Sequence, residues 1–262
     1  MPKRSLSPDR PSIQSSAEAN AADADTRERH EHIWQEFRQR PTVFAHDPRF
    51  LRIPGVVGML TVQVQVGDRT VRRRLRGVVE GLRDVLCVEP LPEDHLHMTV
   101  VPPALLTEGQ PRPPIILPDG FEDQALKPMR EAVRGYGSFE VRIQGLNVFR
   151  DVLVAVAYDG GHSVELRRRL MEAVPQLPQK YWNMLRPLPH ISLAQFCSTD
   201  GVTQLRNAVA QLRDIYLGTL RVTRVYLVRS ALRDGVFGEL KKRAIALSPK
   251  AARGEPRIGR SW

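Results

Sequence analysis

The hydrophobic pattern of this chain alternates repeatedly between the two-residue period of a β-strand and the longer period of an α-helix. Residues 57–66 place Thr61, Gln63 and Gln65 on one face and apolar side chains on the other, as in a strand with one polar side. Residues 70–86 then carry apolar side chains at helical spacing. Because strand–helix–strand units occur in both halves of the chain, the pattern predicts an α+β fold built by duplication.

The same patterns predict the elements along the whole chain. Residues 102–119 are rich in proline and are expected to form a loop, because proline fits neither a helix interior nor a central strand. The expected helices cover residues 27–39, 70–86, 121–134, 162–175 and 202–216. The expected strands cover residues 57–66, 95–101, 138–149, 151–158, 188–196, 219–230 and 236–247.

Composition divides the chain into one folded region between two tails. Residues 1–26 are rich in Ser, Ala, Asp and Pro and have little to bury, so we expect a disordered tail there. Residues 249–262 hold four basic residues and one acidic residue and are expected to form a basic tail. Residues 27–248 are therefore expected to form a single domain of two lobes.

Charge and cysteine content bear on the binding partners and the cellular compartment of the chain. It carries 39 Lys and Arg against 29 Asp and Glu, a net charge of +10, which favours polyanionic partners such as nucleic acid, although solubility alone would also explain it. Two cysteines, Cys87 and Cys197, are too few for a disulfide framework. With no long apolar run and no apolar N-terminal stretch, we expect a cytoplasmic protein without membrane contact.

Two histidines lie in matching sequence contexts, one in each half of the chain. His97 and Thr99 stand two residues apart in an apolar strand pattern, and His190 and Ser192 do the same. Because side chains alternate along a strand, each histidine shares a face with its hydroxyl residue. Two such pairs across a cleft could hold a phosphodiester, with one imidazole as general base, the other as general acid, and the hydroxyls on the phosphate oxygens.

These paired motifs resemble those of the two-histidine (2H) phosphoesterase superfamily, particularly its 2′-5′ RNA ligase-like branch. The resemblance extends over about residues 56–247 and rests on the segments PEDHLHMTVV, FEVRIQGLNVF, DVLVAVAY, HISLA and RVTRVYLVRSAL. It implies a bilobal, pseudo-twofold α+β fold in which two antiparallel sheets line a central cleft and helices pack outside.

The resemblance also implies an activity and its residues. The expected reaction is metal-independent and cofactor-free hydrolysis of an RNA 2′,3′-cyclic phosphate, or of a related cyclic or 2′-5′-linked nucleotide, by a monomer acting on an RNA 3′ end or a small nucleotide. Carried over by position, His97 and His190 are the catalytic pair, and Thr99 and Ser192 bind the phosphate.

One position departs from the branch, and three aromatic residues near the second motif are candidates for base stacking. Relatives often carry Arg three residues after the hydroxyl of the second motif, where this chain has Gln195, so a phosphate-neutralising cation is missing or supplied elsewhere. Tyr181, Trp182 and Phe196 could each stack on a base, although Phe196 equally suits the core.

Other functions remain open from the sequence. His95 is expected on the same strand face as His97, which suits a metal-dependent hydrolase if Glu93, Asp94 or His190 supplied a third ligand. Because Gln195 stands where relatives often carry Arg, a non-catalytic nucleotide or RNA sensor of the same fold is a second alternative. RNA end joining or 3′ trimming is a further alternative within the family.

Overall fold

The computed structural model describes residues 15–45, 56–85, 87–107, 116–177, 188–233 and 236–248. The predicted C-terminal tail and the first part of the predicted N-terminal tail lie outside these ranges. Within them the α+β class is confirmed, because strands and helices are interspersed along the chain and the strand pairs are antiparallel with one exception.

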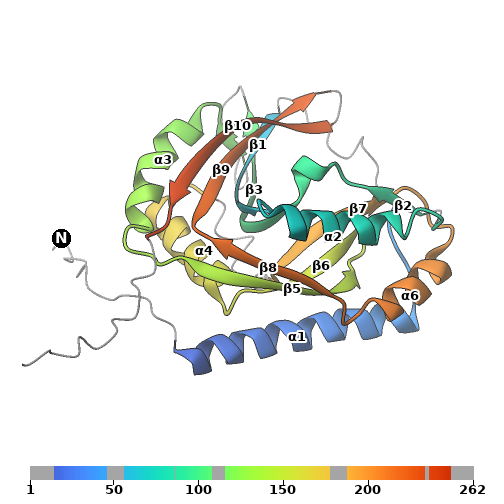
Figure 1. The fold of residues 1–262 in the computed structure, drawn as a ribbon. Coiled ribbons are helices and arrows are strands. Elements are labelled where there is room, and N and C mark those ends of the chain that lie inside the picture. The colour runs from blue at the N-terminus through green and yellow to red at the C-terminus, as the bar shows by residue number, and fades with distance from the viewer. Residues whose placement is uncertain are drawn as a thin grey trace, which may run out of the picture.

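One curled sheet of ten strands runs through the described part of the molecule (Figure 1). Its main path is β10-β9-β1-β3-β7-β6-β5-β8, with β2 pairing β7 and β4 pairing β3 at the sides. The strands are β1 (Val56–Gln65), β2 (Val88–Pro90), β3 (His97–Thr107), β4 (Ile116–Pro118), β5 (Phe139–Val148), β6 (Val152–Tyr158), β7 (His190–Phe196), β8 (Tyr216–Val222), β9 (Arg224–Arg233) and β10 (Val236–Ala246).

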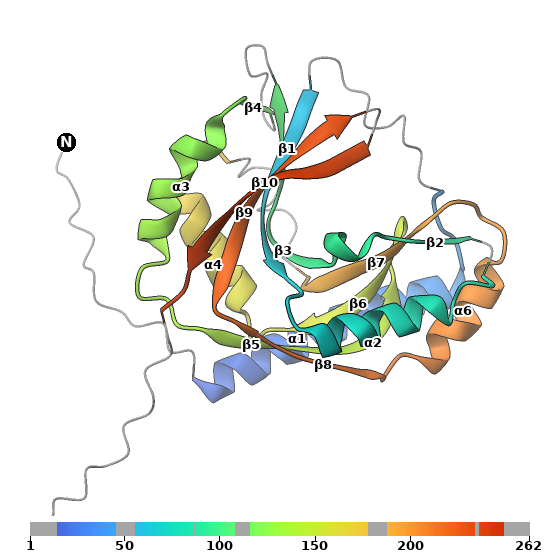
Figure 2. The ribbon, with the colours of Figure 1, turned by 45° about the horizontal axis from the view of Figure 1, so that its top comes forward.

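The prediction of two separate sheets is wrong, because β3 and β7 join the two halves. Their register is defined by one pair of residues, Met98 opposite Ile191. Pairing at this seam satisfies backbone groups that would otherwise form two unpaired edges inside the molecule. The strand twist then curls the continuous sheet into a half-barrel, which Figure 2 shows from a second direction.

Five α-helices accompany the sheet in the described residues, near the places that the hydrophobic pattern predicts. None of them combines the length and the apolar character that crossing a bilayer requires. Their bounds are α1 (Ser16–Gln39), α2 (Arg69–Glu80), α3 (Phe121–Ala132), α4 (His162–Ala173) and α6 (Val202–Gln211), and a short 3-10 helix, η2 (Glu93–His95), precedes β3.

Helix α1 begins eleven residues earlier than expected, inside the segment predicted to be a disordered tail. Ser15 and Glu18 form a capping box, which satisfies backbone N–H groups at the helix start. Asp23 accepts a hydrogen bond from the N–H of Gly160 and pairs with Arg142, 3.7 Å away. Polar contacts to the sheet therefore order a segment that has little apolar surface of its own, and composition alone did not reveal them.

Strand β3 continues through Pro102 and Pro103, where a loop was expected. A bulge makes this continuation compatible with proline, because two residues of β3 stand against one of β1 at this point: Val62 pairs with Val101 and Leu60 with Ala104. The hydroxyl of Thr61, between them, donates to the carbonyl oxygen of Val101 at 2.8 Å. The prolines thus lie where the ladder needs no N–H donor.

The strand predicted over residues 219–230 is two strands. β8 pairs with β5 in one half of the sheet, and β9 pairs with β1 and β10 in the other. Thr223 lies at the corner between them, and its carbonyl oxygen accepts from the N–H of Leu247. Both segments have strand periodicity, so the sequence pattern did not reveal the change of partner.

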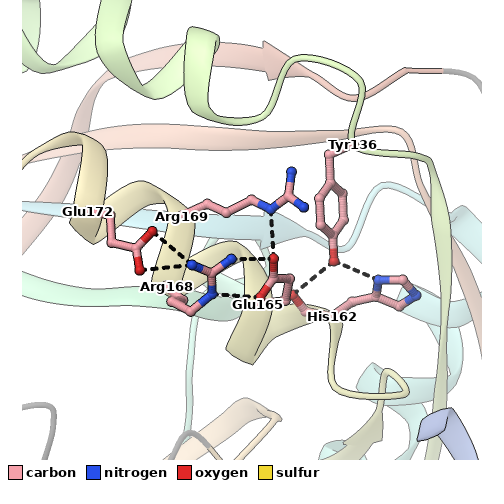
Figure 3. A network of polar contacts seen from close by, with 6 residues as sticks. All are labelled: Tyr136, His162, Glu165, Arg168, Arg169 and Glu172. Carbon is pink, nitrogen blue, oxygen red and sulfur yellow. Dashed lines mark hydrogen bonds and ion pairs between the residues drawn. The ribbon is translucent and has the colours of Figure 1, made fainter. Parts of the chain in front are cut away.

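A polar network along α4 includes Tyr136, which lies between α3 and β5 (Figure 3). The Tyr136 hydroxyl lies 2.7 Å from Nδ1 of His162, the first residue of α4. Further along the helix, Arg168 bonds both Glu165 and Glu172 at 2.8 Å. His162, to which the sequence assigned no function, thus takes part in helix packing.

Gly145 marks a bulge in β5 that a larger residue cannot occupy. Its φ is +87°, and an added Cβ would overlap the carbonyl oxygen of Arg213. We expect Gly145→Ala to lower the free energy of unfolding by about 2–4 kcal/mol, from backbone strain and overpacking together. Chemical denaturation measures the loss. Gly67→Ala, where an added Cβ meets nothing within 4 Å, is the control, and equal stability of the two variants would contradict the assignment.

Candidate active site

The seam between β3 and β7 brings the two histidine motifs together. Because Met98 lies opposite Ile191 in an antiparallel pair, His97 falls opposite Ser192 and Thr99 opposite His190. Met98 and Ile191 are buried on one face of the sheet, and the four motif residues are only partly buried on the other.

The spacing across the seam follows from sheet geometry. Opposed residues in such a pair have Cβ atoms about 4.5–5.5 Å apart and diagonal ones about 7–8 Å apart. His97 and His190 are diagonal neighbours on one face of the sheet.

Both imidazoles are oriented by the same local hydrogen bond. Nδ1 of His97 lies 2.7 Å from the carbonyl oxygen of His95, and Nδ1 of His190 lies 2.7 Å from that of Leu188. A carbonyl can only accept, so Nδ1 carries the proton in each ring. Each neutral imidazole therefore presents Nε2 as a free acceptor, and each charged imidazolium presents Nε2 as a donor.

Burial holds both rings neutral in the absence of a ligand. It lowers the pKa of His97 from 6.5 to about 4; the bond to the carbonyl of His95 opposes this, and the charges of His190, His95 and Lys242 add to it. Burial also lowers the pKa of His190, against the bond to Leu188 and the charge of Asp151. An anion bound between the rings would reverse both effects, because a nearby negative charge favours the imidazolium.

A cavity of about 250 Å³ opens at the first motif. His190 is not among its lining residues, but Ser192 is, and His190 lies two residues away on the same strand face. Neither the Thr99 nor the Ser192 hydroxyl makes a hydrogen bond with another residue in the described part of the chain. The lining residues are Met59, Thr61, Gln63, Leu91, His95, His97, Thr99, Pro103, Ser192, Val228 and Ser230.

The polar face expected for β1 lies at this cavity. Gln63 pairs with Thr99 and Gln65 pairs with His97, so both amides share the face of the first motif. Gln63 is only 4% exposed yet lines the cavity, and Nε2 of Gln65 is buried without a hydrogen-bond partner. A buried amide with an unused donor is costly unless something binds it, so Nε2 of Gln65 is a candidate for a ligand contact beside His97, while Gln63 lines the cavity itself.

The aromatic residues proposed for base stacking do not form a site in the described structure. Tyr181 and Trp182 lie outside the described residues. Phe196 is 0% exposed in the core, so the stacking prediction for it is wrong. The reason is a register shift between β6 and β7, after which residues of β7 no longer keep the face of His190 and Ser192.

Gln195 is engaged by a carboxylate rather than left free. Its Nε2 donates to Glu89 at 3.1 Å. A positive charge comes instead from β10, where Lys242 pairs with Val228 of the cavity wall and lies 5.1 Å from the ring of Tyr226. No local sequence pattern pointed to Lys242, because its position depends on the pairing of the last strand.

His95 is not part of the strand, contrary to expectation. It ends η2, supplies the carbonyl that orients His97, and lines the cavity. Among the residues whose side chains are described, which do not include Asp94, no group of three His, Cys, Asp or Glu side chains is placed to hold a metal ion. The described geometry therefore gives no third ligand to the His95–His97 alternative.

The family follows from residues 70–234, which match the model of the 2′-5′ RNA ligase superfamily. The chain belongs to this superfamily. The match spans more than half of the sequence and confirms the resemblance to the 2H phosphoesterases. No curated protein matches the chain.

Solved structures resemble the fold at low identity. A crystal structure of TT0787 of Thermus thermophilus is 22% identical with a TM-score of 0.51, and the likeness covers 71% of this chain and 97% of that one. Escherichia coli LigT complexed with phosphate is 17% identical with a TM-score of 0.49, covering 73% and 99%. Usb1 of Kluyveromyces marxianus with uridine monophosphate is 14% identical with a TM-score of 0.43, covering 74% and 99%.

The buried neutral His97 has a consequence for stability that can be measured without a substrate. Between pH 6.5 and about 4 its imidazole is protonated in the unfolded chain but neutral in the folded one. The unfolded state then binds more protons, so the free energy of unfolding falls as the pH falls through this window. We expect His97→Gln to reduce the difference in bound protons between the unfolded and folded states by up to one, so the free energy of unfolding should depend less steeply on pH in this window.

Denaturation between pH 4 and 7 measures this slope. His32→Gln, which replaces an exposed histidine on α1, is the control. An unchanged slope in His97→Gln would mean that His97 titrates alike in both states.

Proposed function

We propose that this member of the 2′-5′ RNA ligase superfamily is a metal-independent phosphodiesterase that opens an RNA 2′,3′-cyclic phosphate or a related cyclic or 2′-5′-linked nucleotide. The observation that carries the proposal is the matched geometry of His97 and His190. Each ring is held by a backbone carbonyl at Nδ1, and each shares a strand face with a hydroxyl side chain. Two histidines held by the same local hydrogen bond suit a reaction that needs one proton acceptor and one proton donor on opposite sides of a phosphorus atom.

In the proposed reaction, neutral Nε2 of one histidine takes a proton from water as the water oxygen bonds to phosphorus. The bond between phosphorus and the departing ribose oxygen breaks, and the protonated Nε2 of the other histidine supplies that oxygen with its proton. The Thr99 and Ser192 hydroxyls donate to the non-bridging oxygens, whose charge grows in the transition state.

The cavity favours a small substrate or the end of a chain. Its volume of about 250 Å³ lies below the roughly 300–1,000 Å³ typical of pockets for drug-sized ligands. A cyclic phosphate with its ribose fits such a space better than a duplex does. The positive charge of Lys242 beside the cavity wall supports an anionic substrate.

Substitution of either histidine tests the paired mechanism. We expect His97→Ala and His190→Ala each to lower kcat by about 10²–10⁴-fold, because each removes a positioned proton transfer. The wild type should show a bell-shaped dependence of kcat/KM on pH. Turnover is measured on 2′,3′-cyclic, 3′,5′-cyclic and 2′-5′-linked substrates after exhaustive chelation, with products resolved by mass.

His32→Gln is the matched control for these variants. Full turnover by either alanine variant would refute the mechanism, and activity that disappears on chelation would favour the metal-dependent alternative.

Removing the hydroxyls separates phosphate binding from proton transfer. We expect Thr99→Val and Ser192→Ala each to weaken binding of a cyclic phosphate by about tenfold, since each removes a hydrogen bond to a charged group. The bell shape of the pH profile should persist. Thr219→Val, at an exposed position on β8, is the control, and unchanged binding in both cavity variants would exclude the proposed phosphate contacts.

A binding protein without turnover is the second candidate. The hydrogen bond between Gln195 and Glu89 favours it, because a cation found in relatives is absent and a carboxylate lies at that position. Tight binding of a 2′,3′-cyclic nucleotide by calorimetry with no product formed would support this alternative over hydrolysis.

A further inference from the structure

Helix α1 lies outside the family match, yet it packs on the face of the sheet that carries His190. The match begins at residue 70, after this helix ends. On the sheet, His190 pairs with Val156 of β6, so Tyr158, two residues further on, shares its face. Arg27 of α1 lies over the Tyr158 ring, 5.9 Å from its centre. Figure 1 shows α1 running beneath β5 and β8.

His30 is the residue of α1 that reaches the second motif. It is 1% exposed, and its Nε2 lies 3.3 Å from the carbonyl oxygen of Pro189, the residue before His190. The same carbonyl accepts from the N–H of Ala157. The start of β7 is therefore held by β6 on one side and by α1 on the other.

Asn147 fixes the tautomer of His30. Its Oδ1 accepts from the N–H of Val148 at 2.9 Å, so its Nδ2 is the donor to Nδ1 of His30 at 3.1 Å and to the His30 carbonyl at 2.8 Å. With Nδ1 accepting, the ring proton lies on Nε2 and points to Pro189. Burial lowers the pKa of His30 to about 3, so the ring stays neutral and this arrangement does not change near neutral pH.

Phe149 links His30 to the His190 ring. It stacks on His30 with ring centres 5.8 Å apart and planes inclined by 15°. Its edge-on contact with His190 has ring centres 4.8 Å apart. The Phe149 ring, which packs on His30 of α1, thus covers one side of the His190 ring. In the described part of the chain, no aromatic ring is stacked on His97.

We propose that His30 is a positioning residue for His190, so that α1 contributes to the geometry of the active site. The inference rests on the proposed function, in which His190 transfers a proton. His30 contacts neither substrate nor reacting atoms. It acts by holding the Pro189 carbonyl and the Phe149 ring, which set the direction of Nε2 of His190 and keep water from that side of the ring.

The test compares two substitutions of His30. His30→Leu removes the N–H donor and the stacked ring, whereas His30→Gln keeps an N–H within reach of Pro189. We expect His30→Leu to lower kcat by about 10–100-fold with little change in KM, because a small displacement of a proton-transfer group is costly. His30→Gln should recover most of that loss.

A spectroscopic measurement accompanies the kinetics. Water admitted beside His190 should raise its pKa toward the usual value in His30→Leu, since burial is what lowers it. NMR titration of the His190 ring signals, assigned with His190→Gln, records this shift. Asp151 acts on the pKa of His190, whereas His190, Arg213 and Arg29 act on that of His30. His190 also acts on the pKa of His97, and the substitutions of His30 leave all of these other groups unchanged.

Trp34→Phe is the matched control for loosening α1. Trp34 is buried one turn beyond His30 and contacts Phe37 and Arg213. The proposal is overturned if His30→Leu keeps the kcat of the wild type, or if Trp34→Phe lowers kcat equally at the same loss of stability.

The two proposals can fail separately. If the wild type hydrolyses none of the substrates, the proposed function fails, and the His190 titration alone decides the role of His30. An unshifted His190 pKa in His30→Leu would then overturn the positioning role as well.

Discussion

The arrangement of this molecule depends on one short stretch of backbone pairing, where Met98 of β3 meets Ile191 of β7. That pair joins two half-sheets into one continuous sheet and fixes the register between the two histidine motifs. A shift of one residue would turn His190 and Ser192 toward the core and Ile191 toward the cavity, because side chains alternate along a strand. The buried side chains of Met98 and Ile191 oppose that shift, so core packing on one face secures the geometry of the other.

The groups that surround the pairing of β3 and β7 suit an anionic ligand. Two imidazoles are held neutral by burial, two hydroxyls have no partner in the described structure, and the buried Gln63 of β1 lines the cavity at the first motif. Each of these groups would be more stable with a phosphate present than without one, since the anion supplies hydrogen-bond acceptors and a favourable charge. Binding would therefore be coupled to proton uptake by a histidine, which is the proton that the proposed reaction later needs.

Much of the fold and part of the site could be predicted from local pattern. The strand and helix periods located the main elements from β1 to β10, and the matched frames of His97 and His190 identified the family. The errors arose where distant contacts decide. Residues 16–26 lack apolar surface but are ordered by Asp23 and its partners on the sheet, β3 passes two prolines through a bulge, and Phe196 turns inward after a register shift.

The sequence by itself identified the residues proposed to carry the chemistry, because two-residue periodicity places His97 on one face with Thr99 and His190 on one face with Ser192. Only the tertiary structure decided what surrounds them: that the two strands are neighbours, that Gln63 and Lys242 adjoin the first motif, and that His30 and Phe149 confine His190. The physical reason is that periodicity is a property of neighbouring residues in the chain. Burial, register and the packing of α1 depend on contacts between residues far apart in the chain, which no local pattern encodes; His30 and Pro189, for example, are 159 positions apart.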